Sequence, residues 1–109
     1  MRLPSSSTIK RLAAASLVLA AWPAFAQDAP ALRQQALAAT CANCHGTQGR
    51  AVEGAAVPGL AGMPASYMVE QLKAFRAGTR PATVMHQLAK GFSEAQIDQV
   101  AAYFAAQKK

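Results

Sequence analysis

The chain has 109 residues, with 11 Lys and Arg against 5 Asp and Glu and a formal net charge of +6. This length allows one small domain and excludes a large enzyme with several domains. Hydrophobic residues make up 52% of the chain, but alanine is by far the commonest of them. Because alanine buries little area, the percentage overstates the size of the core.

The N-terminal segment, 1–26, is predicted to be a secretory signal peptide. A short basic stretch precedes an apolar run at 12–21 (LAAASLVLAA), and a small-residue cleavage site follows at 24–26 (AFA). The apolar run is shorter than the ~20 residues that span a bilayer, which disfavours the alternative of an uncleaved membrane anchor. We therefore expect an exported domain over residues 27–109, with no stable membrane span after cleavage.

The predicted exported domain is less basic than the whole chain, because cleavage removes Arg2, Lys10 and Arg11 but no acidic residue. The remaining basic residues are scattered and are not interleaved with aromatic residues in one tract, which argues against nucleic-acid binding. Large apolar residues are few in this domain, and so small a core is marginal without further support. A disulfide between Cys41 and Cys44 would close a tiny loop and add little stability. We expect another group to fill the centre.

The motif Cys41-Ala42-Asn43-Cys44-His45 indicates which group this is. C-x-x-C-H in an exported chain is the attachment sequence for c-type haem. Two thiols three residues apart on a helical turn reach the two vinyl groups of the porphyrin, and His45 places an imidazole under the iron. The sequence therefore predicts one haem c, attached covalently through Cys41 and Cys44.

Three other interpretations of the motif remain open. A thioredoxin-like redox pair needs a βαβ context, and no segment of the chain alternates like a strand. A structural zinc site needs four ligands, and Cys41, Cys44, His45 and His86 form such a set, although their spacing matches no finger pattern. The pentapeptide could also occur by chance.

The remaining segments are predicted to be helices and loops. Pro30 suits the first turn of a helix over 31–40, and the glycine-rich stretch 46–62 is expected to be a loop. A second helix is predicted over 64–77, capped by Ser66 and burying Met68, Leu72 and Phe75. A short helix or turn at 83–90 follows. The last helix is predicted from a Ser93–Gln96 capping box to about Gln107, with an apolar face at Ile97, Val100, Ala101 and Phe104.

Three blocks of sequence, in order, carry a family resemblance: CANCHGTQGR, VPGLAGMPASYMVEQLKAFRAGTRPATVM and LAKGFSEAQIDQVAAYF. The chain resembles class I c-type cytochromes of the cytochrome c4 type, and most of all the haem subunits of flavocytochrome c sulfide dehydrogenases. The resemblance covers about residues 32–107. It implies an all-α fold of three to five helices around one haem, with the terminal helices crossing at Tyr103 and Phe104.

The sixth ligand of the iron must come from the face of the haem opposite His45. The candidates are Met63, Met68, Met85 and His86. Met68 belongs to an apolar stripe and is expected in the core, and Met63 precedes the second helix. Met85 matches the axial-methionine position of the family, so the expected metal ligands are His45 and Met85, with His86 as the bis-histidine alternative.

The resemblance also implies roles around the haem. Pro58 matches a proline whose carbonyl accepts the N–H of the proximal histidine, although it could equally be an ordinary turn proline. Three arginines, Arg50, Arg76 and Arg80, could pair with haem propionates or simply be solvated. A modest basic ring could steer an acidic partner toward the exposed haem edge, and its members would be Lys73, Arg76, Arg80 and Lys90.

These expectations favour an electron-transfer protein with no catalytic residues. The resemblance implies a periplasmic cytochrome that accepts electrons from a flavoprotein sulfide dehydrogenase, as its subunit or partner. One alternative is a separate c4-like shuttle to a terminal oxidase. Another is a haem enzyme or sensor with an open iron site.

Overall fold

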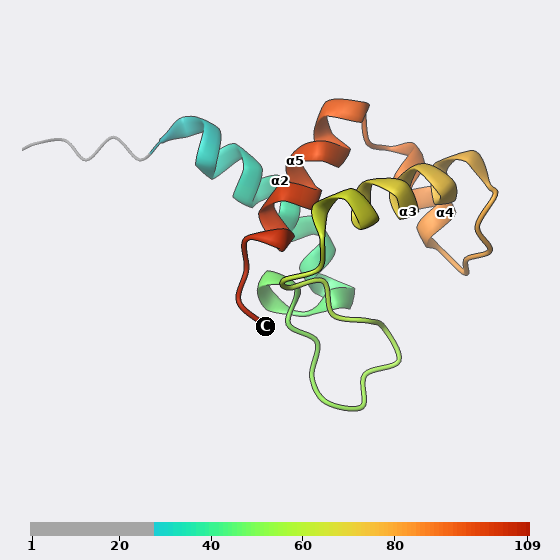
Figure 1. Ribbon diagram of the computed structural model, residues 1–109, viewed down its shortest axis with the longest axis horizontal. Helices are drawn as coiled ribbons and strands as arrows, with labels where there is room; N and C mark the ends of the chain where they lie inside the picture. The colour runs from blue at the N-terminus through green and yellow to red at the C-terminus, as the bar shows by residue number, and fades with distance from the viewer. Residues whose placement is uncertain (1–27) are drawn as a thin grey trace, which may run out of the picture.

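The computed structural model describes residues 28–109, which form four α-helices, one short 3-10 turn and connecting loops (Figure 1). The helices are α2 (Ala29–His45), α3 (Ala65–Ala77), α4 (Met85–Lys90) and α5 (Glu94–Ala105), and the turn η1 (Thr47–Gly49) follows α2. No strand occurs in this range, so the all-α fold is confirmed. The predicted signal peptide lies outside the described residues. None of the described helices has the length and apolar character needed to cross a membrane.

Helix α2 is longer than predicted at both ends. Pro30 lies in its first turn, as expected, but the helix continues beyond Thr40 through the cysteine motif to His45. It ends at Gly46, which has φ = 85°. A Cβ at this position would lie 2.0 Å from the carbonyl oxygen of Arg50, so only glycine fits this sharp change of direction.

Helix α3 begins at Ala65, and the predicted cap at Ser66 is wrong. The N-cap position is Pro64, and no side chain caps the helix there. Proline is suited to this place because its φ of −56° is already close to helical. Of the predicted apolar stripe, Met68 is buried while Leu72 and Phe75 are half-buried. The helix ends at Gly78 in the left-handed conformation.

Helix α5 begins with the predicted capping box. The Ser93 hydroxyl accepts from the Gln96 backbone N–H at 3.2 Å, and the Gln96 side chain accepts from the Ser93 N–H at 2.9 Å. Its buried residues, Ile97, Val100, Ala101 and Phe104, are the predicted apolar face. Helix α4, a short helix packed against α3, lies inside the segment predicted at 83–90.

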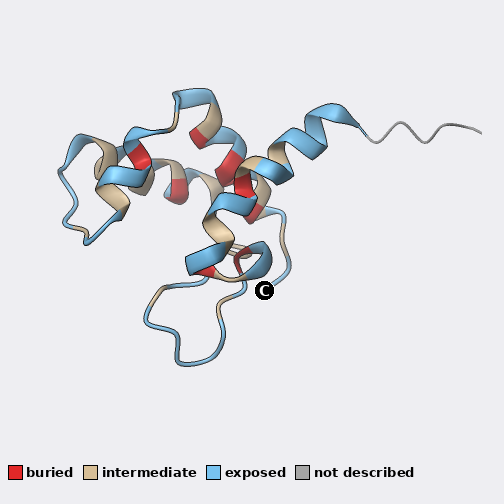
Figure 2. Ribbon diagram, turned by 180° about the vertical axis from the view of Figure 1, so that it is seen from behind, coloured by how far each residue is buried: buried red, intermediate tan, exposed pale blue. Residues whose placement is uncertain are grey.

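The core lies where α2 and α3 both pack against α5 (Figure 2). Its buried cluster consists of Ala38, Met68, Val100, Ala101 and Phe104. Phe104 is fully buried and meets Tyr103 edge to face, with ring centroids 5.2 Å apart. Seven apolar residues are buried in the described chain, and three of these are alanines. The polypeptide alone therefore provides a very small core.

Candidate functional site

Cys41 and Cys44 lie on the last two turns of α2, three residues apart, so their side chains project from neighbouring positions on one side of the helix. Both thiols are free; Cys41 is half-buried against the core, while Cys44 is exposed. Burial raises the pKa of Cys41, and the Thr40 hydroxyl 3.9 Å from its sulfur opposes that effect only in part. The helix thus presents two separate thiols to one neighbouring group.

His45, the last residue of α2, is 9% exposed. Its Nδ1 lies 2.6 Å from the carbonyl oxygen of Pro58. Because a carbonyl can only accept, Nδ1 carries the proton and Nε2 keeps its lone pair in the neutral ring. In metal-binding histidines, a hydrogen bond from the ring nitrogen that does not bind the metal fixes the orientation and the tautomer of the ring. The hydrogen bond implied by the family resemblance is therefore present, and Nε2 is suited to an iron atom.

Gly49 holds together the two ends of the loop that carries Pro58, and we call this closing contact, between Gly49 and residues 60–61, the neck of the loop. The Gly49 carbonyl accepts hydrogen bonds from the backbone N–H groups of Leu60, at 2.7 Å, and Ala61, at 3.1 Å. Gly49 has φ = 78°, and a Cβ there would lie 2.7 Å from the Phe104 ring. Gly62 N–H donates to the Phe104 carbonyl at 2.9 Å. These contacts fasten both ends of the loop to η1 and α5, and so set the position of Pro58.

The structure separates the candidates for the sixth ligand. Met68 is part of the buried cluster, as predicted, and Met63 packs against that cluster. Met85 is the half-buried first residue of α4, and His86 follows it. The His86 Nδ1 is buried and has no hydrogen-bond partner among the described residues. Met85 and His86 are thus the two candidates that the core does not engage.

Two alternative interpretations of the cysteine motif lose support. Within residues 28–109, no group of three or more His, Cys, Asp or Glu side chains lies close enough to hold a metal ion. The four residues considered for zinc are therefore not brought together. A thioredoxin-like site also lacks its strands in this range.

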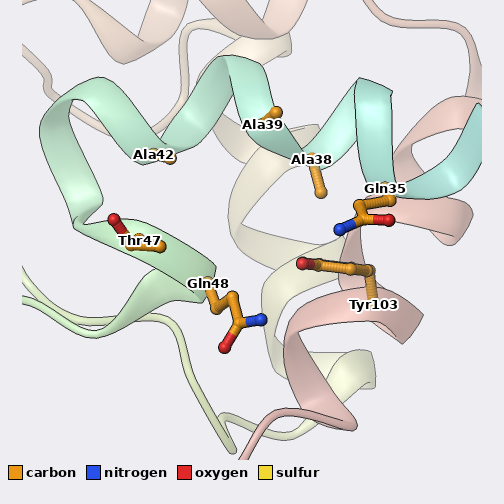
Figure 3. Close-up of a pocket in the computed structure, with 7 residues that line it drawn as sticks. All are labelled: Gln35, Ala38, Ala39, Ala42, Thr47, Gln48 and Tyr103. Atoms are coloured by element: carbon orange, nitrogen blue, oxygen red, sulfur yellow. The ribbon is translucent and has the colours of Figure 1, made fainter. Parts of the chain in front are cut away.

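A small pocket of about 170 Å³ lies between α2, η1 and α5 (Figure 3). Its lining residues are Gln35, Ala38, Ala39, Ala42, Thr47, Gln48 and Tyr103. The α2 residues of this lining fall on a different face of the helix from the thiols. The volume is also below the ~300–1,000 Å³ of ordinary cofactor sites. This pocket is therefore not where a haem would bind.

The donor set and the packing both fit a haem. Two free thiols and a buried imidazole with an available Nε2 follow one another on α2. The alanine-rich core needs an additional apolar body, and several large apolar side chains are only partly covered by the protein. The exposed ones are Leu32, Val52, Tyr67, Val84 and Leu88.

The arginines considered for propionate binding are engaged within the protein. Arg76 bonds to Glu94 and to the Phe92 carbonyl, at 3.3 Å for the latter. Arg80 donates to Gln71 at 2.6 Å and stacks 4.5 Å from the centre of the Phe75 ring. The Arg50 Nε donates to the Lys108 carbonyl at 2.9 Å. None of these contacts could have been read from spacing in the sequence, since the partners of Arg50 and Arg76 lie on other elements.

Comparisons with known proteins show relatives of this chain among the cytochromes. The cytochrome c family model matches residues 31–108. The cytochrome subunit of sulfide dehydrogenase from Chlorobaculum tepidum is 36% identical over 103 residues, which cover 85% of this chain and 92% of that protein. The thiosulfate dehydrogenase electron acceptor of Thiomonas intermedia is 40% identical over 93 residues, covering 85% of this chain and 42% of that one.

Among solved structures, the cytochrome c4 of Acidithiobacillus ferrooxidans aligns with a TM-score of 0.64 and 34% identity, over 73% of this chain and 51% of that one. The chain thus spans about half the length of two of these relatives and nearly all of the third.

The two thiols, the oriented imidazole and the all-helical fold define a c-type cytochrome. The chain belongs to the cytochrome c family. It carries a single haem c on Cys41 and Cys44 and is an electron carrier rather than an enzyme.

Proposed function

We propose that this protein is a periplasmic cytochrome that accepts single electrons from a flavoprotein sulfide dehydrogenase, as its haem subunit or partner. The observation that supports this most directly is the similarity to the sulfide dehydrogenase subunit of Chlorobaculum tepidum, because 92% of that protein is covered. An exported chain cleaved after Ala26 would place the haem in the periplasm. Residues 27–109 are too few to hold a flavin as well, so the chemistry on sulfide would take place outside this segment.

In this proposal His45 and Met85 would bind the haem iron. His45 is buried and held by Pro58, so its ring would keep one orientation in both oxidation states. The Met85 thioether is a soft, uncharged donor that raises the reduction potential relative to a second histidine. If both residues bind the iron, they would exclude substrates and small molecules from the metal.

Haem c, when bound, supplies a ferric–ferrous couple that gains or loses one electron. The residues of this chain would supply a rigid setting for it. Cys41 and Cys44 would hold the porphyrin permanently, and the hydrogen bond between His45 and Pro58 would hold the imidazole. A site that moves little between the two states suits electron transfer to a docked partner.

The proposed axial ligands are tested by the optical spectrum of the exported protein. We expect a low-spin spectrum with a methionine–iron charge-transfer band in the ferric state. A high-spin ferric spectrum would support the open-site haem enzyme or sensor. Mass spectrometry should also find the chain from Gln27 to Lys109 with one haem attached, and a mass without haem would refute the assignment.

The proposed partner is tested by co-purification from the native periplasm. We expect a flavoprotein to accompany the cytochrome, and reduction of the haem when sulfide is added to the complex. The alternative of a separate shuttle is favoured by the structural similarity to cytochrome c4. A cytochrome that purifies alone, and that a sulfide-reduced flavoprotein does not reduce, would favour the shuttle.

A further inference from the structure

We propose that Arg50 is a positioning residue for the haem iron, acting through Pro58 and His45. Its side chain ties the C-terminal tail to the neck of the loop that supplies the Pro58 carbonyl. This inference rests on the proposed role of His45 as the axial ligand.

Arg50 makes two side-chain contacts on opposite sides of its guanidinium. Nε donates to the Lys108 carbonyl at 2.9 Å, and Nη1 donates to the side chain of Gln48. Gln48 has φ = 55°, and non-glycine residues adopt the left-handed region only when their surroundings hold them there. Arg50 therefore links η1, which is locally strained, to the last residues of the chain.

The C-terminal tail also rests on the far end of the loop. A Cβ on Gly62 would lie 2.9 Å from Cγ of Lys109 and 3.3 Å from the Gln107 carbonyl oxygen. With the hydrogen bond between Gly62 and Phe104, the tail is fixed on one side by Arg50 and on the other by the end of the loop. Both ends of the loop are thus held to one short segment of the chain.

Pro58 lies just before the residues that close the loop. The next residue, Gly59, would place a Cβ 3.1 Å from the Gly49 carbonyl oxygen, and Leu60 donates to that oxygen at 2.7 Å. A shift of the neck therefore changes the position of the Pro58 carbonyl against His45. Arg50 itself is exposed, so solvent screens its charge and its effect comes through geometry.

The strength of the hydrogen bond between His45 and Pro58 should change the reduction potential of the iron in a definite direction. A short bond from Nδ1–H to a carbonyl makes the imidazole a more electron-rich ligand, which favours the ferric state. Loosening that bond should raise the reduction potential. It should also expose the His45 ring N–H to exchange with solvent.

The test uses the haem-loaded, exported protein and a small set of variants. Arg50→Gln removes the charge and both contacts, whereas Arg50→Lys keeps the charge but cannot make both contacts. Truncation after Gln107 removes the carbonyl acceptor, whereas Lys108→Ala keeps it. Arg33→Gln, on an exposed part of α2, controls for the loss of one positive charge. The measurements are the reduction potential and, by NMR of the ferrous protein, the exchange rate of the His45 ring N–H.

We expect Arg50→Gln, Arg50→Lys and the truncation to raise the potential and to speed ring N–H exchange about tenfold or more. Lys108→Ala and Arg33→Gln should match the wild type. Truncation after Gln107 also removes the Lys109 side chain that lies against Gly62, so it is compared with truncation after Lys108, which removes that contact alone. Relative to this control, truncation after Gln107 should add nothing in the Arg50→Gln background, because both changes then break one connection. The proposal is overturned if Arg50→Lys behaves as wild type while Arg50→Gln does not, which would indicate a charge effect. It is also overturned if the variants lose stability with an unchanged potential.

A separate variant tests whether His45 is the iron ligand, on which this proposal rests. His45→Gln should abolish the low-spin spectrum with Arg50 intact. If it does not, His45 is not the ligand, and this result is obtained before any Arg50 variant is measured.

Discussion

The carbonyl oxygen of Pro58 lies 2.6 Å from Nδ1 of His45, although the two residues are 13 positions apart in the chain. The contact uses the main chain of Pro58, so any residue at this position can supply the acceptor. The proline ring contributes instead by restricting the backbone that carries it.

Replacement of Pro58 by alanine should therefore have a mild effect. We expect Pro58→Ala to keep the low-spin spectrum and to lower the free energy of unfolding by about 0.5–1 kcal/mol, because the unfolded chain gains freedom. Guanidinium unfolding followed by haem absorbance measures this change. Loss of the methionine–iron band in this variant would show that the carbonyl position depends on the proline itself.

The proposed sixth ligand can be tested against a matched methionine. Met85→Leu should abolish the methionine–iron band and lower the reduction potential, because leucine offers no sulfur to the iron. Met63→Leu should keep the band and cost less than about 1.5 kcal/mol, because Met63 only packs against the core. The opposite result, with the band lost in Met63→Leu alone, would exchange the two assignments.

Two glycines with nearly equal φ angles allow the energetic cost of backbone strain to be measured apart from the cost of steric overlap. Gly54 has φ = 77° with open space around it, whereas Gly49 has φ = 78° and meets the Phe104 ring. Gly54→Ala should cost about 1–2 kcal/mol from the left-handed backbone alone. Gly49→Ala should cost a further ~1–3 kcal/mol from overpacking. Equal losses in the two variants, measured by denaturant unfolding, would contradict the contact with Phe104.

Glu94 should make stability depend on pH in the acidic range. Lys73, at 2.8 Å, and Arg76 hold the pKa of Glu94 below its ordinary value of 4.5. A carboxylate with a lowered pKa in the folded state stabilises the protein above its unfolded pKa, and the effect is lost as the pH falls through the folded pKa.

We therefore expect Glu94→Gln to be less stable than the wild type at pH 7, with the difference disappearing as the pH falls below the ordinary pKa of glutamate and through the lowered pKa of Glu94. Thermal unfolding at several pH values measures it. Glu70→Gln, which removes a carboxylate that forms no ion pair in the described part of the chain, is the control. A difference that persists in acid would mean that Glu94 acts through packing.

The same ion pairs should weaken the electrostatic attraction of a partner. Of the four basic residues predicted to surround the haem edge, Lys73 and Arg76 share Glu94, which leaves Arg80 and Lys90. Raising the salt concentration should therefore slow reduction by an acidic partner less than about tenfold. Stopped-flow measurements over a range of ionic strength test this, and a steeper loss would show that the two paired residues still steer.

Local patterns in the sequence predicted the elements that depend on neighbouring residues. The Ser93–Gln96 capping box and the buried face of α5 follow from spacings of three and four residues, and both are confirmed. The boundaries of α2 were less accurate, because this helix extends through the cysteine motif. Helix α3 matches its predicted bounds to within one residue but lacks the predicted cap at Ser66. The end of α2 and the start of α3 both depend on how the loop between them packs, which no local pattern records.

The candidate site likewise contains residues that the sequence predicts and contacts that it does not predict. The thiols and the imidazole could be predicted because they lie within one short, continuous motif. The contact of Arg50 with the tail could not, because it joins a side chain to a main-chain carbonyl 58 residues away. The place of Met85 came from family resemblance, and its role as a ligand stays a prediction.

The scarcity of large buried side chains has a consequence for the life of the protein. Phe104 and Ile97 are the largest fully buried residues between positions 28 and 109, so before the cofactor is attached this part of the chain has little to hold it in a compact shape. Attachment of the cofactor and folding should then be nearly one event, with the newly made chain open to the machinery that attaches the porphyrin. Molecules that miss this step would be removed by proteases, so iron and porphyrin supply would set how much cytochrome accumulates.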